Sequence, residues 1–175
     1  MKMPSKKQIS MLLVSLLVAS WFFYRLRLLS ADNNKTFATC QIGEISNFGD
    51  CSNDIFQIVA RKMGLEINES IPKPIILTDK EITRKKFNDY LGWDAEEISP
   101  YYFYKKNTIV IPPDCKLDSL AHELAHYFQV MYQNENLDFD CGAYIENLEM
   151  EAVAIQRWFK AKYLQPQKPE HGIDG

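Results

Sequence analysis

The chain has 175 residues, of which 46% are hydrophobic and 25% are charged, and its formal net charge is -3. This is an ordinary globular composition, so it excludes a disordered, collagen-like or coiled-coil protein. Because there is no excess of basic residues, we expect no nucleic-acid partner.

The first 30 residues differ from the rest of the chain in charge and hydropathy. Residues 1–29 contain five basic residues and no acidic one, so the remainder carries -8. The segment 9–24 has no charged residue, and three lysines precede it. A basic start followed by an apolar run is typical of a targeting segment. We expect residues 1–30 to form a transmembrane signal anchor, which holds the N-terminus inside and the following domain outside the cytoplasm.

Two other interpretations of this segment are open. A signal peptide cleaved before Trp21 would release a secreted protein, because Val18 and Ser20 are small enough for a cleavage site. A buried core helix fits less well, because a basic N-terminal flank is not expected for one. Both exported interpretations place the acidic domain across a membrane.

About 145 residues remain, enough for one domain with one core. Apolar periodicity and turn residues predict helices and short strands, which places this domain in the α+β class. In chain order we expect a linker and loop at 31–52, a domain at 53–165 and a flexible tail at 166–175. Within the domain we expect a helix at 53–63, a strand at 75–77, a helix at 78–91, a hairpin of strands 101–104 and 108–111, and helices at 117–133 and 144–163.

Three of these helix starts have candidate capping residues. Asn53 can cap the first helix. Thr78 and Glu81 fit a capping box at the start of the second. Asp114 or Asp118 is expected to cap the helix at 117–133.

The four cysteines all follow the N-terminal segment. Their even number predicts two disulfides in an oxidising compartment, and short separation favours Cys40–Cys51 with Cys115–Cys141. The alternative is buried free thiols in a cytosolic protein. No CxxC spacing is present, which argues against a cysteine-only zinc site.

The strongest functional signal is His122-Glu123-Leu124-Ala125-His126, an HExxH motif. Residues four apart lie on one side of a helix, so both imidazoles can bind one Zn²⁺. The carboxylate of Glu123 can then reach a water on that metal and act as general base. The helical wheel predicts that His122, His126 and Gln129 face an open side of the helix, opposite its leucines.

A catalytic zinc site needs a third protein ligand. The following helix offers Glu146, Glu149 and Glu151, of which Glu149 and Glu151 point to different sides. We expect this helix to be buried nearly all round, and a buried carboxylate needs a partner. This weakly favours Glu149 and leaves Glu151 as the alternative.

HELAH followed by Glu149-Met-Glu151-Ala152 resembles the HExxH…ExxA arrangement of gluzincins, a branch of the zincin metallopeptidases. The resemblance covers roughly residues 72–165. It implies a zincin-like fold, in which a short β-sheet or hairpin packs on the active-site helix and a following ligand helix. It also implies one zinc ion held by His122, His126 and Glu149, with Glu123 as catalytic base.

The resemblance further implies a peptide or protein substrate, which would pair with strand 108–111. The chain departs from the family at Val153, where several members have an aspartate that orients a histidine ligand. The metzincin pattern fails, because Gln129 and Tyr132 replace its glycine and third histidine.

The leading hypothesis is therefore a zinc metallopeptidase. Candidate donors to the oxyanion are Tyr127, Tyr144 and His171. The main alternative is a non-catalytic membrane-tethered module that binds zinc or another protein. A plain exported domain with a chance motif is the third interpretation.

Overall fold

A computed structural model of the chain describes residues 37, 40–42, 45–135 and 142–165. The chain divides into two compact units at residues 35 and 36, and all the described residues belong to the second. The predicted N-terminal segment 1–30 and the predicted tail 166–175 lie outside the described residues. Within the described ranges, no helix has both the length and the hydropathy needed to cross a membrane.

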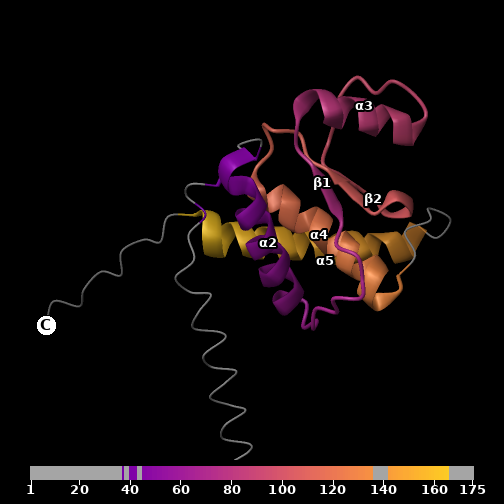
Figure 1. Cartoon of the computed structure of the whole chain (residues 1–175). Helices are drawn as coiled ribbons and strands as arrows, with labels where there is room; N and C mark the ends of the chain where they lie inside the picture. The colour runs from indigo at the N-terminus through magenta and orange to yellow at the C-terminus, as the bar shows by residue number, and fades with distance from the viewer. Residues whose placement is uncertain (1–36, 38–39, 43–44, 136–141, 166–175) are drawn as a thin grey trace, which may run out of the picture. The chain divides into compact units, whose positions relative to one another are not determined.

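The described residues form an α+β fold, as predicted (Figure 1). Its three strands are β1 (Ile75–Leu77), β2 (Tyr101–Phe103) and β3 (Thr108–Val110). Its four α-helices are α2 (Ile45–Lys62), α3 (Lys80–Leu91), α4 (Leu117–Gln133) and α5 (Gly142–Phe159). A π-helical segment, Lys160–Leu164, continues α5.

The three strands form one sheet in the order β1-β3-β2. β3 pairs with β1 in parallel and with β2 as the predicted antiparallel hairpin. The hairpin closes through one turn of 3-10 helix at Tyr104–Lys106 and through Asn107, whose φ of 45° is left-handed. Because β3 is central, both of its edges are occupied. The expectation that residues 108–111 pair with a substrate is therefore wrong.

The two faces of the sheet pack on different helices. Side chains alternate along a strand, so Ile109 and Tyr102 face one core while Val110 and Phe103 face the other. The first core is the larger and includes α2, α4 and part of α5. The second is smaller and contains Phe87 of α3. Figure 1 shows α3 on one side of the sheet and α4 with α5 on the other.

Helix α2 begins at Ile45, eight residues before the predicted start at Asn53. The polar segment 45–52 suggested a loop, but half-buried Phe48 and buried Cys51 continue the apolar stripe of Ile55 at helical spacing. Asn53 therefore lies inside the helix, where its Nδ2 donates to Gly49 O. The expected cap at Asn53 is wrong.

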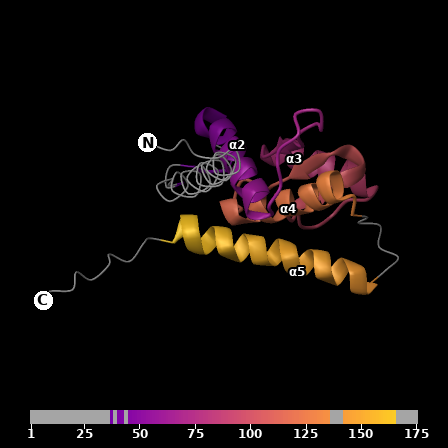
Figure 2. The same cartoon turned by 90° about the horizontal axis from the view of Figure 1, so that it is seen from below.

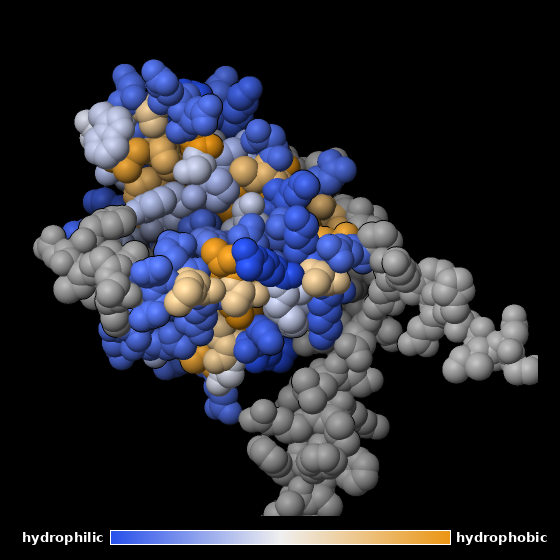
Figure 3. Space-filling view, turned by 180° about the vertical axis from the view of Figure 1, so that it is seen from behind, coloured by the Kyte–Doolittle hydropathy of each residue, from blue (hydrophilic) through white to orange (hydrophobic). Residues whose placement is uncertain are grey.

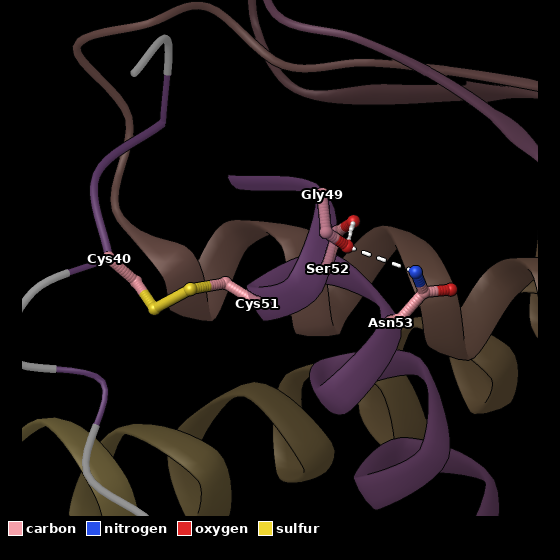
Figure 4. Close-up of a disulfide and its surroundings, with 5 residues drawn as sticks. All are labelled: Cys40, Gly49, Cys51, Ser52 and Asn53. Atoms are coloured by element: carbon pink, nitrogen blue, oxygen red, sulfur yellow. Dashed lines mark hydrogen bonds between the residues drawn. A yellow bond between two sulfur atoms is a disulfide. The ribbon is translucent and has the colours of Figure 1, made fainter. Parts of the chain in front are cut away.

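The predicted Cys40–Cys51 disulfide is present and joins the chain before α2 to the first half of that helix (Figure 4). Cys115 has a free thiol, in contrast to the predicted Cys115–Cys141 pair. Cys141 lies outside the described residues.

Two further helix starts differ from prediction. Asp79 caps α3 in place of Thr78, because its Oδ1 accepts hydrogen bonds from the backbone N–H groups of Glu81 and Ile82. At α4 the capping position is Lys116, and no side chain caps it. Asp118 lies buried in the first turn and Asp114 precedes the helix, so neither acts as the expected cap.

Helices α4 and α5 lie side by side and run in opposite directions (Figures 1 and 2). Among the side chains of α5 that the structure describes, from residue 146 on, only one side is buried, through Leu148, Ala152, Ile155 and Phe159. The helix is thus an outer layer, and the expectation that it is buried nearly all round is wrong. The face shown in Figure 3 is mostly hydrophilic, with small apolar patches between polar side chains.

Candidate metal centre

The antiparallel pairing of α4 and α5 brings His122, His126 and Glu149 together. The Nε2 atoms of the two histidines, four residues apart on α4, lie 3.2 Å from each other. Glu149 approaches from α5, with carboxylate oxygens 3.5 Å from His122 Nε2 and 3.2 Å from His126 Nε2. One ligand atom from each residue lies within 4.8 Å of the other two, so this cluster can hold a metal ion.

A buried glutamine sets the proton on His126. The Nε2 of Gln129 donates to Leu148 O and to Glu151 Oε2, each at 3.0 Å. Both acceptors require the NH₂ group on that side, so Gln129 Oε1 must face His126 and accept from its Nδ1 at 2.9 Å. His126 therefore carries its proton on Nδ1, and its Nε2 presents a lone pair to the cluster.

The geometry of the cluster fits a cation. His126 Nε2 and Glu149 Oε1 lie 3.2 Å apart, and His122 Nε2 and Glu149 Oε2 lie 3.5 Å apart. Imidazole nitrogen and carboxylate oxygen both have lone pairs that a cation among them can accept.

Glu149 is more exposed than expected, because α5 is an outer helix. Its side chain is 52% exposed, against 17% for His122 and 8% for His126. Burial therefore does not explain the position of Glu149, and the argument that favoured it for this reason is wrong. Solvent therefore reaches the carboxylate of Glu149, while the two imidazoles stay largely buried.

The side of α4 that was expected to be open is instead covered by α5. His126 is 7% exposed and Gln129 is fully buried. Glu151, the alternative third ligand, does not join the cluster, because its Oε2 accepts from Gln129.

Glu123, the predicted general base, lies deeply buried beside His122, with 6% exposure. Burial, with a smaller contribution from the charge of Glu149, raises the pKa of Glu123 to about 8. The backbone N–H of Tyr102 donates a hydrogen bond to the carboxylate and acts in the opposite direction. The N–H of an edge strand thus holds the carboxyl of Glu123.

The surroundings of His122 favour the neutral imidazole that metal binding requires. Burial and the neighbouring ring of His126 lower the pKa of His122, while Glu149 raises it. Its neutral form is thus favoured, and neutral imidazole is the form that binds metals.

The three expected oxyanion donors have different positions. Tyr127 is fully buried and its hydroxyl donates to Pro72 O, so it is committed elsewhere. The side chain of Tyr144 and all of His171 lie outside the described residues.

Tyr101, which was not predicted as a site residue, is a described phenol that lies within electrostatic reach of Glu123 and Glu149. Burial raises the pKa of Tyr101, and the charges of Glu123 and Glu149 raise it further. Sequence alone does not distinguish Tyr101 from its β2 neighbour Tyr102. The one sequence feature that could have pointed to Tyr101 is its position at the start of the predicted hairpin.

Comparisons with protein-family models, with curated proteins and with solved structures found no match to this chain.

Proposed function

We propose that the chain is a zinc metallopeptidase of the zincin type, which hydrolyses peptide bonds with a metal-activated water. The observation that carries this proposal is the meeting of His122, His126 and Glu149 beside the buried carboxyl of Glu123. Two imidazoles and one carboxylate are the ligand set of several zinc peptidases, and they leave a fourth position open.

The distances in the cluster support zinc. Tetrahedral zinc with bonds of about 2.0–2.1 Å places its ligand atoms about 3.3–3.4 Å apart. The Nε2 atoms of His122 and His126 lie 3.2 Å apart, Glu149 Oε2 lies 3.5 Å from the first and Glu149 Oε1 lies 3.2 Å from the second. With one ligand atom from each residue, the three atoms lie within 4.8 Å of one another, so a single carboxylate oxygen need move only slightly to join both imidazoles on one ion.

Bound zinc would polarise the scissile carbonyl and lower the pKa of a water beside it. Glu123 takes the proton from the attacking water and delivers it to the leaving amine. Its raised pKa suits this role, because the carboxyl can hold the proton between the two transfers. The hydroxyl of Tyr101 is the candidate donor to the developing oxyanion.

The substrate class that fits is an extended peptide. Among the described strands β2 pairs only with β3, so no strand covers its outer edge, where the N–H of Tyr102 donates to Glu123. A peptide that added to β2 would therefore pass beside the catalytic carboxyl. Strand β2 takes the role first expected of residues 108–111.

We place the peptidase domain outside the cytoplasm, anchored by residues 1–30 or secreted after their removal. The disulfide between Cys40 and Cys51 supports an oxidising compartment. The basic and apolar composition of residues 1–30 supports export.

The proposal is tested by zinc content and peptidase activity of three variants. Glu123→Gln should keep about one zinc per chain and lose activity by a factor of about 10²–10⁴, because it removes the general base. His126→Ala should lose both zinc and activity. Glu146→Gln, which removes an exposed acid of α5, should keep both. Zinc is measured by elemental analysis, and activity by cleavage of a mixed peptide library.

Two results would contradict the proposal. A wild type without zinc at neutral pH would remove its basis. A wild type that binds zinc but cleaves no more than Glu123→Gln would favour the alternative, a non-catalytic zinc-binding or protein-interaction module.

A further inference from the structure

Gln129 and Glu151 link the two helices that carry the cluster, and neither is a ligand. Gln129 lies on α4 one turn after His126, and Glu151 lies on α5 two residues after Glu149. We propose that these two residues, the Gln129–Glu151 bridge, are positioning residues that fix the tautomer and orientation of the His126 ring for metal binding. This inference rests on the metal site of the proposed function and adds residues that its motif does not contain.

The bridge allows only one orientation of the Gln129 side-chain amide and excludes the orientation rotated by 180°. Both hydrogens of Gln129 Nε2 are used, one by Leu148 O and one by Glu151 Oε2. A flipped amide would turn its oxygen toward these two acceptors and its NH₂ toward His126. Because the Gln129 side chain is fully buried, water cannot replace the hydrogen bonds that the flipped amide would lose.

Glu151 does more than link α4 and α5 by a hydrogen bond. Leu148 O alone would leave one Nε2 hydrogen unpaired, whereas the carboxylate of Glu151 accepts it in a charge-assisted bond. A polarised amide is a stronger acceptor at Oε1, which makes the opposite nitrogen of His126 a better metal donor.

The test compares Glu151→Ala, Glu151→Gln and Gln129→Leu in the full-length chain. Zinc affinity is measured by competition with a chromophoric chelator, and the protonated ring nitrogen of His126 by ¹⁵N NMR of the metal-free protein. Gln129→Leu should weaken zinc binding about 10–100-fold, the usual effect of losing a partner of a metal ligand. Glu151→Ala should weaken it in the same direction.

Two variants separate positioning from charge. Glu151→Gln should restore much of the affinity, because its amide oxygen can still accept from Gln129. Glu146→Ala removes an exposed acid from the same helix and should bind zinc as the wild type does. Metal-free Glu151→Ala should also lose the single Nδ1-protonated form of His126, a change that a merely structural tie would not produce.

The inference is overturned if Glu151→Ala binds zinc with wild-type affinity and keeps the wild-type ring shifts. Because Glu151 is exposed, this variant stays informative even if Gln129→Leu does not fold. Should the wild type bind no zinc, the proposed function fails, while the NMR comparison on metal-free protein still tests the bridge.

Discussion

At the scale of single residues, the ionisation of Glu123 follows from its surroundings. A carboxyl with 6% exposure loses most of its hydration, and the N–H of Tyr102 only partly compensates. Its pKa of about 8 means that the metal-free protein keeps this carboxyl protonated at neutral pH. A cation among the neighbouring ligands would favour the ionised form.

The raised pKa predicts how Glu123→Gln changes stability. The unfolded chain releases this proton near pH 4.5, whereas the folded chain holds it up to about pH 8. Wild-type stability therefore falls as pH rises between these values, by at most about 1.4 kcal/mol per pH unit from this group. Glu123→Gln removes the penalty, so the variant should gain stability over wild type at pH 8 and little at pH 5.

Chemical denaturation of both proteins in the presence of a chelator measures this difference. Other titrating groups are shared by the two chains and cancel in the comparison. An equal difference at both pH values would show that Glu123 does not titrate as proposed.

Residue identity predicted some parts of the candidate site and not others. His122, Glu123 and His126 could be located because their spacing places them together on any helix. Gln129 was placed with the histidines, but its partners on α5 depend on how two helices pack. Tyr101 was missed because its proximity to the cluster arises from the sheet and not from any local pattern.

At the scale of elements, most helix and strand bounds follow from local patterns, but the starts of α2 and α3 do not. α4 has the predicted limits, because its apolar stripe is continuous from Leu117 and no glycine or proline interrupts it. The predicted start of α2 was too late, because the polar residues of its first two turns made the few buried positions there hard to recognise. The start of α3 was also missed by local pattern. Thr78 and Asp79 can both cap a helix, and the backbone conformation decides which of them occupies the capping position.

This choice predicts a difference between two neighbouring substitutions. Asp79→Ala should lower the free energy of unfolding by about 1 kcal/mol, because it removes the acceptor for two backbone N–H groups. Thr78→Ala, the matched control one residue earlier, should cost less. Urea denaturation measures both. An equal loss in the two variants, or a larger one for Thr78→Ala, would mean that Asp79 does not cap α3 in solution.

At the scale of the whole molecule, the sequence predicts the α+β class but not how the elements are arranged. Nothing local indicates that β1 pairs with β3 across the intervening α3 and β2, which makes β3 central. Nor does the wheel of α5 show that one side stays in solvent. Both features depend on contacts between segments far apart in the sequence.

The position of α5 predicts the effect of metal on the folded protein. Only one side of α5 is packed, so an ion shared by α4 and α5 should add a cross-link between them. Zinc at 100 times its dissociation constant should stabilise the wild type by about 2.7 kcal/mol, and Glu149→Ala should lose much of this gain. Glu146→Ala, on the same helix, should keep it.

Thermal unfolding with zinc and with chelator measures the effect, and hydrogen exchange should show added protection in α5. A zinc-dependent gain in Glu149→Ala equal to that of the wild type would remove Glu149 from the ligand set.

The division of the cluster between two successive helices also bears on the time at which the protein becomes competent during its synthesis. A nascent chain that has emerged only as far as α4 presents both imidazoles and the general base but lacks the carboxylate from α5. On the proposed function, hydrolytic power is thus postponed until α5 has also been synthesised and has packed on α4.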